Sequence, residues 1–464
     1  MQHAFLLSFM KNEVILLDPQ EQKYIAMTQP PEGRIICRLA VPCIISMLVT
    51  AFYNMADTFF VGMLKSNAAT GAVGVVFSMM AIIQAVGFFF GHGSGNYISR
   101  AMGQKHYADA STMAATGFFL AIGAGFLICV LGQIFLEPLS YFLGSTDSIL
   151  PYTKDYLRII LLGAPWMTAS LVLNNQLRFQ GSATYAMVGI TCGAVLNIAL
   201  DPLMIFVLDM KVAGAGLATI ISQFVSFCVL LAGCSRGGNI RIRFRNARLN
   251  LHYITQIVRG GLPSLARQSI ASLATICLNN AAKPYGDVVI AAMSVVQRVM
   301  QFGASAMIGF GQGFQPFCGF NYGAKLMDRV KKGFWFCVKS SFVFLCVVAA
   351  LGFLFAPQLV AIFRDDPDVI ACGALALRLQ CCSFPFQSFI VMSNMMQQVM
   401  GKTGPATFLA LARQGVFFIP AVLLLPLCWG VLGIQMAQAI SDLCTLLCAI
   451  PLQMHILRSL SRES

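Results

Sequence analysis

Long apolar stretches recur along almost the whole chain and limit its possible folds more than any other feature. A helix needs about 20 apolar residues to cross the roughly 30 Å hydrocarbon core of a bilayer. Stretches of this length lie near residues 35–60, 72–97, 111–135, 155–178, 186–208, 212–233, 254–281, 289–315, 333–356, 370–398, 406–427 and 430–453. Because backbone polar groups inside a bilayer must be paired within the protein, these stretches predict an all-α integral membrane protein with twelve transmembrane helices.

The composition excludes a water-soluble protein. Apolar residues make up 58% of the chain, charged residues make up 11%, and the mean hydropathy is +0.75. Soluble domains contain roughly 45–50% apolar and about 25% charged residues. The 16 cysteines lie mostly inside apolar stretches and lack metal-ligand spacing. We therefore interpret them as small hydrophobic residues rather than as disulfides or metal ligands.

Basic residues gather in alternate connections between the expected helices. They are Arg100, Lys105, Arg178, Lys325, Arg329, Lys331, Lys332, Lys402, Arg458 and Arg462, together with the five arginines of segment 234–253. The positive-inside rule then predicts that both termini are cytoplasmic. Contact with anionic lipid headgroups explains the net charge of +13, so no nucleic-acid partner is expected.

The second half of the chain repeats the first. The segment SRAMGQKHYADA at 99–110 matches GFNYGAKLMDRV at 319–330, and Asn174 matches Asn394. Each half contains six expected helices, an even number, so the two halves share one topology. We expect two six-helix lobes related by pseudo-twofold symmetry, with a cavity between them.

The repeat divides the chain into five segments. These are an N-terminal cytoplasmic tail at 1–33, an N-lobe with helices 1–6 at 34–233, a basic cytoplasmic linker at 234–253, a C-lobe with helices 7–12 at 254–455, and a cytoplasmic tail at 456–464. We expect the first tail to be disordered. Residues 1–26 lack the features of a signal peptide, and Met27 offers an alternative start.

Two aspartates lie inside apolar stretches of the first half. Asp57 is near the outer end of the first expected helix, and Asp201 lies in the fifth, four residues after Asn197 and on the same helix face. A charge at mid-membrane costs roughly 2.5–3.5 kcal/mol on insertion scales. Two carboxylates in one apolar lobe therefore take up a proton or hold a cation between them. We interpret this pair as a coupling site for H⁺ or Na⁺.

The second half lacks this acid pair and carries intramembrane arginines instead. Arg267 and Gln268 lie about one turn past Pro263 in the seventh expected helix, deep enough to line a cavity. An arginine at this depth receives an anionic substrate group or bonds to backbone carbonyls, and both interpretations stay open.

Two other classes of protein are excluded by missing motifs. The sequence has no Walker A motif, so the single chain is not an ATP-driven pump. Its five histidines are scattered and no HExxH motif occurs, so we expect neither an enzyme nor a cofactor.

Several motifs in matching order resemble the MATE family of multidrug and toxic compound extrusion transporters, in particular its DinF/MepA-like bacterial branch. They are DTFFVG (57–62), NIALDP (197–202), VAGAGLATIISQ (212–223), VVQRVMQF (295–302) and LARQGVFFIP (411–420). The resemblance covers residues 33–455. It implies two six-helix lobes of the MATE fold, driven by an H⁺ or Na⁺ gradient.

The resemblance also implies specific site residues. The family's cation site corresponds to Asp57, Asn197, Asp201 and Thr219, which would also hold Na⁺ if that is the coupling ion. Residues expected to line the substrate cavity are Arg267, Gln268, Asn174 and Gln380.

The function implied is cation-coupled antiport of drugs or other small amphiphilic molecules. We expect a monomer in the bacterial inner membrane, with the small-molecule substrate and membrane lipid as its partners. The alternative is a flippase for a lipid-linked or anionic substrate of the same superfamily, although such proteins often have fourteen helices.

Overall fold

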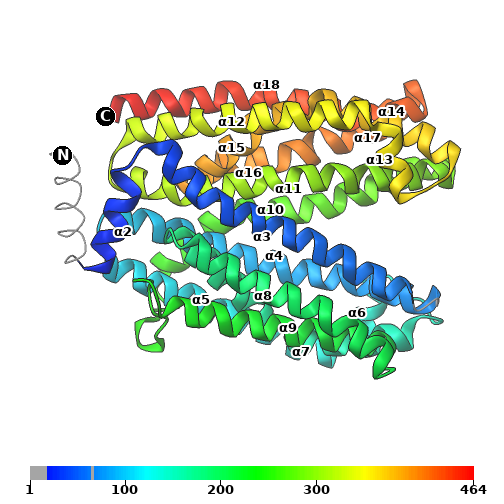
Figure 1. Cartoon of the computed structure of the whole chain (residues 1–464), viewed down its shortest axis with the longest axis horizontal. Coiled ribbons are helices and arrows are strands. Elements are labelled where there is room, and N and C mark those ends of the chain that lie inside the picture. Colours follow the sequence, from blue (N-terminus) through cyan, green and yellow to red (C-terminus); the bar gives the residue numbers. More distant parts are fainter. Residues whose placement is uncertain (1–17, 64–66, 464) are drawn as a thin grey trace, which may run out of the picture.

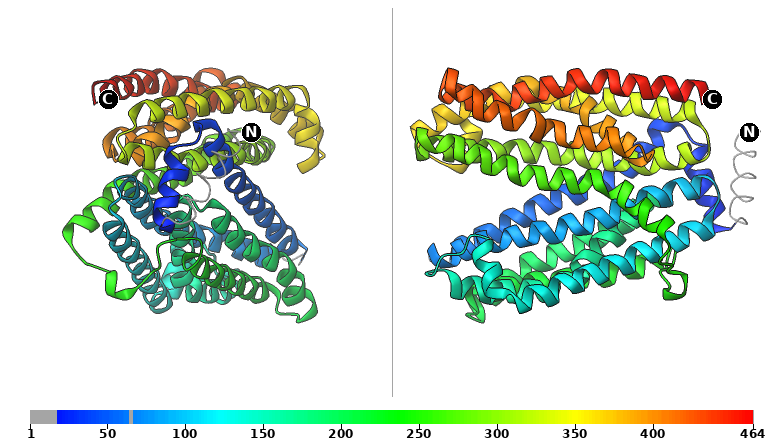
Figure 2. Two further views of the ribbon diagram at one scale, coloured as in Figure 1. Left: turned by 60° about the vertical axis from the view of Figure 1, so that its left-hand side comes forward. Right: turned by 180° about the vertical axis from the view of Figure 1, so that it is seen from behind.

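The chain folds as two groups of membrane-length helices. The computed structural model describes residues 18–63 and 67–463, and no strand occurs among them. Helices α3–α9 gather in one group, the N-lobe, and helices α10–α18 in the other, the C-lobe (Figures 1 and 2). Within the described residues, eleven segments are apolar and long enough to span a membrane. A twelfth helix, α10 (Leu251–Ala282), has 32 residues but contains two arginines that lower its hydropathy. The predicted all-α fold is confirmed.

The six spans of the N-lobe follow the predicted apolar stretches closely. The elements of this lobe are α3 (Glu32–Gly62), α4 (Asn67–Gly103), α5 (Tyr107–Ile134), α6 (Leu136–Phe142), α7 (Leu150–Phe179), α8 (Ala183–Pro202), the π-helix η1 (Leu203–Val207) and α9 (Lys211–Cys234). Helix α6 is too short to cross a bilayer and lies between two spans. The fifth span consists of α8 continued by η1.

The C-lobe has the same order of elements. Two short 3₁₀ turns, η2 (Phe244–Asn246) and η3 (Lys283–Tyr285), flank its first helix α10. The elements that follow are α11 (Asp287–Gly323), α12 (Met327–Leu354), α13 (Ala356–Phe363), α14 (Pro367–Ser383), η4 (Phe384–Phe386), α15 (Gln387–Val399), α16 (Thr403–Leu411), the π-helix η5 (Ala412–Val416), α17 (Phe418–Trp429) and α18 (Val431–Glu463). The tenth span thus runs from α14 through α15, and the eleventh from α16 through α17.

Backbone details confirm the internal repeat. Lys105 and Lys325, which the sequence repeat aligns, are both left-handed, with φ of 61° and 58°. Gly181 and Gly401 both have a φ of 78° at the next repeated turn. Non-glycine residues rarely adopt this conformation, so its recurrence at matching positions shows that the two halves share local structure.

Glycines bring the two lobes into close contact at the end of the molecule that carries α2 (Pro19–Thr28) and the end of α18, here called the α2 end (Figure 1). A Cβ atom added at Gly103 would lie 2.2 Å from the carbonyl oxygen of Phe320, and one at Gly323 would lie 2.2 Å from that of Arg100. Because no side chain fits at either glycine, α4 and α11 pack backbone to backbone here. The lobes diverge toward the opposite end (Figure 1).

Both predicted tails contain helix. Within the first, α2 occupies residues 19–28 and buries Met27 and Thr28, while residues 1–17 lie outside the described part of the chain. In the second, α18 continues to Glu463 because Ile456, Leu457 and Leu460 are buried against the rest of the protein. The segment predicted as a linker occupies the connection between Cys234 and Leu251.

Candidate functional site

The predicted cation-site residues of the N-lobe are all buried and come from three helices. Asp57 lies near the end of α3, Asn197 and Asp201 lie in the last turns of α8, and Thr219 lies in α9. Their exposed fractions are 3%, 1%, 0% and 1%, in that order. Helix α8 packs against both α3 and α9, so the fold brings these positions together although they are far apart in the sequence.

The side chains of these four residues form few hydrogen bonds. The Asn197 side-chain amide donates to Asp201 Oδ1 at 3.4 Å, as expected for residues four apart on one helix face. The Thr219 hydroxyl donates to the Ala215 carbonyl at 2.9 Å. Among the described residues, Asp57 Oδ1, Asp201 Oδ2 and Asn197 Oδ1 have no hydrogen-bond partner. Buried polar atoms are normally paired, so these three oxygens can bind a hard cation, and the two carboxylates can instead take up a proton.

Tyr156 belongs to the same cluster and was missed by the sequence analysis. It lies in the second turn of α7, is completely buried, and interacts electrostatically with Asp57 and Asp201. Its hydroxyl lies beside Thr219 but outside regular hydrogen-bond geometry, so within the described chain its oxygen is also unpartnered. Charged residues surround it in the sequence, namely Lys154, Asp155 and Arg158, so no local pattern distinguishes it. Here we define Asp57, Asn197, Asp201, Thr219 and Tyr156 as the N-lobe polar cluster.

The C-lobe contains a buried acid that the sequence analysis also missed. Asp442 in α18 is 1% exposed and forms an ion pair with Arg413 Nε at 2.8 Å. Its carboxylate also accepts bonds from Ser383, Gln387 and Gln438 at 3.2, 3.0 and 2.9 Å. Both carboxylate oxygens are therefore occupied by donors, one of them a cation. The buried acids of the two lobes therefore differ. Asp57 and Asp201 each have a carboxylate oxygen without a donor among the described residues, whereas both oxygens of Asp442 accept hydrogen bonds.

Hydrogen bonds do not connect the four residues that are predicted to line a substrate cavity into one network. Arg267 in α10 is half-buried, and its Nη1 donates to Asn394 Oδ1 at 3.5 Å. Gln268 follows it in the same helix and is also half-buried. Gln380 is 5% exposed in α14, where its backbone carbonyl accepts from the Ser383 hydroxyl at 3.1 Å. Asn174 lies in the N-lobe and donates to the Ala186 carbonyl at 3.1 Å.

Arg178 is buried, whereas the charge pattern placed it in a connection outside the membrane. It lies in the last turn of α7 and is only 3% exposed. Helix α7 ends beside Gly95 of α4, where a Cβ would lie 2.2 Å from the Phe179 ring. Because α4 continues to Gly103, two turns further, and α11 packs against both helices, the end of α7 is enclosed by protein.

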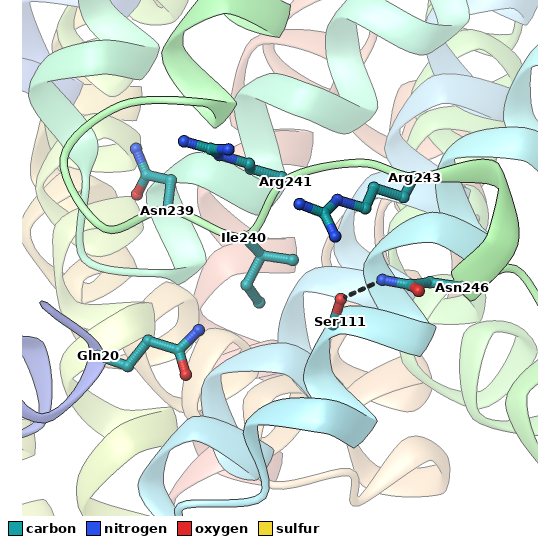
Figure 3. Close-up of a pocket in the computed structure, with 7 residues that line it drawn as sticks. All are labelled: Gln20, Ser111, Asn239, Ile240, Arg241, Arg243 and Asn246. Atoms are coloured by element: carbon teal, nitrogen blue, oxygen red, sulfur yellow. Dashed lines mark hydrogen bonds between the residues drawn. The ribbon is translucent and has the colours of Figure 1, made fainter. Parts of the chain in front are cut away.

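A separate pocket of about 260 Å³ lies between α2, the first turns of α5 and the linker (Figure 3). It is lined by Gln20 of α2, Ser111 of α5 and the linker residues Asn239, Ile240, Arg241, Arg243 and Asn246. The Asn246 amide donates to the Ser111 hydroxyl at 2.9 Å. None of the residues predicted for the cation site or the substrate cavity lines this pocket.

Comparisons with known proteins agree with this architecture. The multidrug export protein MepA of Staphylococcus aureus (strain MSSA476) is 25% identical over 442 residues, which cover 94% of this chain and 96% of MepA. A crystal structure of MATE in complex with MaL6 matches with a TM-score of 0.89 at 24% identity, covering 95% of this chain and 99% of the other. An outward-facing structure of a multidrug resistance MATE family transporter matches with the same TM-score and identity, over 94% and 98%.

One family model matches the chain twice. The description of the model is MatE, and the matches cover residues 42–203 and 263–424. The start and the end of the second match are displaced from those of the first by the same interval, which agrees with the internal repeat. Since the two matches together cover more than half of the sequence, this multi-pass membrane protein belongs to the MatE family of transporters.

Proposed function

We propose that the chain is an antiporter that exports small amphiphilic organic molecules in exchange for H⁺ or Na⁺. The observation that carries this proposal is the N-lobe polar cluster, in which two buried carboxylates keep unpartnered oxygens among the described residues. Such groups inside a membrane are typical of ion pathways and proton relays. The relatives named multidrug export protein favour small organic substrates over a lipid-linked one.

The cluster can bind either coupling ion with the groups it has. A proton would be shared between Asp57 and Asp201, and would lower the charge of the pair to −1. A sodium ion would take oxygen ligands from the carboxylates, from the Asn197 amide and from the hydroxyl groups of Thr219 and Tyr156. Both ions relieve the repulsion between two carboxylates that interact across α3 and α8.

Coupling requires that the ion and the substrate prefer different states of the protein. In the proposed cycle the ion binds the state open to the outside and weakens substrate binding, so the substrate leaves. The lobes then rock about their contact and release the ion inside. One pH unit of gradient supplies about 1.4 kcal/mol per proton.

The end of α8 offers a place for the required backbone change. Asp201 is followed by Pro202, which lacks a backbone N–H, and then by the π-helix η1. Interruptions of this kind are frequent at functional sites because they leave carbonyl groups free and helices easier to bend. Ion binding at Asp201 would act directly on this turn.

We further propose that the protein works as a monomer in the bacterial inner membrane with both termini cytoplasmic. The linker arginines and α2 then face the cytoplasm, and the diverging ends of the lobes face outward. The basic lining of the pocket in Figure 3 supports this orientation.

The test is dye efflux from proteoliposomes under an imposed H⁺ or Na⁺ gradient. Wild type is compared with Asp57→Asn and Asp201→Asn, and with Asp155→Asn, which changes an exposed acid of α7. We expect one gradient to drive efflux, both cluster variants to lose at least tenfold in gradient-driven rate, and Asp155→Asn to behave as wild type. Efflux that ignores both gradients, or that survives both cluster substitutions, would contradict the proposal.

A further inference from the structure

Two arginines and a histidine lie on helices at the contact between the lobes, where α10 packs against α4. Arg178 of α7 and His92 of α4 belong to the N-lobe, whereas Arg267 of α10 belongs to the C-lobe. Arg178 and His92 are each 3% exposed, and both interact electrostatically with Arg267. We call these three residues the interlobe basic cluster.

The side chains that accept hydrogen bonds from Arg178 are neutral. Its Nη1 donates to Gln312 Oε1 of the C-lobe at 2.6 Å, and its Nη2 donates to Asn175 Oδ1 at 2.5 Å. His92 Nε2 lies 3.4 Å from the same Nη2. The Nε atom of Arg178 is buried and has no acceptor among the described residues. One donor of this guanidinium is therefore unsatisfied, in a place where a buried donor is normally paired.

No carboxylate in the described part of the chain forms an ion pair with Arg178 or Arg267. The acids of the ion pairs there are Glu21, Glu32, Glu137, Asp328 and Asp442. Arg413, which is 25% exposed, is by contrast neutralised by the buried Asp442 at 2.8 Å. An unpaired charge in a membrane interior is unfavourable by several kcal/mol, so a cluster with two such charges is suited to an anionic partner.

Neutral side chains occupy the matching positions of the second half. The internal repeat aligns Arg178 with Gln398 and His92 with Gln312. Gln398 donates to the Gly260 carbonyl at 2.9 Å and to the Ser264 hydroxyl at 2.7 Å, so a neutral side chain fills this position in the C-lobe. The counterpart of Arg267 in the first half is a serine, Ser46.

Arg267 is the most exposed member of the interlobe basic cluster. It is half-buried, unlike Arg178 and His92, and the 3.5 Å from its Nη1 to Asn394 Oδ1 is long for a hydrogen bond. Asn394 is itself fixed by donating to the Ala406 carbonyl at 2.6 Å. The amide oxygen thus holds Arg267 loosely, and its guanidinium can still donate to a ligand.

We propose that the interlobe basic cluster binds the anionic group of an amphiphilic substrate, a carboxylate or sulfonate, and that exported molecules therefore include organic anions and zwitterions. Arg267 would contact the anion directly and Arg178 would strengthen the positive field behind it. Planar guanidinium groups suit such oxyanions because two parallel donors match two oxygens. This inference rests on the proposed export function and specifies its substrate class.

Equilibrium binding to the purified protein tests the proposal without any ion gradient. Fluorescence anisotropy is measured with carboxyfluorescein, an anion, and with ethidium, a cation. We expect wild type to bind carboxyfluorescein, and Arg267→Gln to weaken this binding roughly tenfold or more, the effect of losing a charge-assisted hydrogen bond, with ethidium binding not weakened. Arg267→Lys should retain part of the affinity because it keeps the charge.

The control is Arg378→Gln, which removes an arginine of α14 whose Nε donates to the Phe353 carbonyl. It should bind both dyes as wild type does, and the melting temperature of every variant is measured to exclude misfolding. Unchanged carboxyfluorescein binding in a folded Arg267→Gln protein, or equal loss of both dyes, would overturn the proposal. If carboxyfluorescein binds as expected but gradient-driven efflux is absent, the result contradicts the proposed ion coupling and supports the proposed anion site.

Discussion

Asn174 and Asn394 make the same hydrogen bond in the two lobes, each donating to a backbone carbonyl further along the chain, at 3.1 Å to Ala186 and 2.6 Å to Ala406. The carbonyls belong to the first turns of α8 and α16. The asparagines therefore fasten the fourth and tenth spans to the helices that follow them. Asn394 differs in that its side-chain oxygen also accepts from Arg267.

This symmetry gives a test of the predicted cavity role of Asn174. Each carbonyl keeps the hydrogen bond of its own helix, so replacing the asparagine removes one additional hydrogen bond, at a cost of about 0.5–1.5 kcal/mol. We expect Asn174→Ala and Asn394→Ala to lower the melting temperature by similar amounts, and only Asn394→Ala to change carboxyfluorescein affinity. If Asn174→Ala melts like wild type but binds dyes differently, Asn174 lines the cavity after all.

The positions of the spans could be predicted from sequence because each one is an apolar stretch of bilayer length. The burial of the N-lobe polar cluster could be predicted in part, since Asn197 and Asp201 share a helix face four residues apart. The roles of Tyr156 and Asp442 could not, because most of the groups around them come from other helices. The burial of Arg178 depends on α4 and α11 extending beyond the end of α7, which no local pattern reveals.

The hydroxyl of Tyr156 should contribute to ion binding rather than to stability. It is buried beside Asp57, Asp201 and Thr219 and makes no regular hydrogen bond within the described residues, so Tyr156→Phe removes no such bond. We expect the variant to melt almost as wild type does, but to need a several-fold larger ion concentration for half-maximal efflux. Tyr141→Phe is the control, since Tyr141 donates to Asp147 at 2.7 Å on the surface.

A different outcome would change the composition of the site. If Tyr156→Phe leaves the ion dependence unchanged in both H⁺ and Na⁺ gradients, the tyrosine only fills space and the ligands are the four residues predicted from sequence. If it unfolds the protein, the hydroxyl has a structural partner.

The Arg413–Asp442 pair should stabilise the C-lobe without coupling transport to an ion. Removing one partner of a buried pair is typically destabilising by about 3–5 kcal/mol, because the other charge remains buried. We expect Arg413→Gln to lower stability strongly, because Asp442 is buried, and Asp442→Asn to lower it less, because Arg413 is 25% exposed. The double variant should be less destabilised than the sum of the two. Chemical or thermal unfolding in detergent measures this double-mutant cycle.

The same variants distinguish the two lobes functionally. In proteoliposomes that contain folded Asp442→Asn protein, efflux should keep the ion dependence of wild type, because the donors around Asp442 already satisfy its carboxylate. Loss of gradient dependence in this variant, with efflux down a substrate gradient intact, would show that the C-lobe acid takes part in coupling.

Lys23 of α2 should make the attachment of this helix depend on pH. Burial lowers the pKa of Lys23 to about 8, and its ammonium donates to Asn239 Oδ1 of the linker. Helix α2 also joins the N-lobe through the Lys105–Glu21 ion pair at 2.6 Å and the C-lobe through Asn321, which donates to the Met27 carbonyl at 3.1 Å. It therefore bridges both lobes at the α2 end.

The sign of the effect follows from the two states of Lys23. An unfolded lysine has a pKa near 10.4, so between about pH 8 and 10 the detached form binds more protons than the docked form. Stability contributed by α2 should then be lowest below about pH 8 and rise as the pH increases toward about 10. Melting temperatures measured across this window should show the rise in wild type and lose it in Lys23→Met. Lys332→Met, which removes an exposed lysine of α12, should keep it. If the melting temperature of Lys23→Met changes with pH in the same way as that of wild type, Lys23 is exposed to water while α2 is docked.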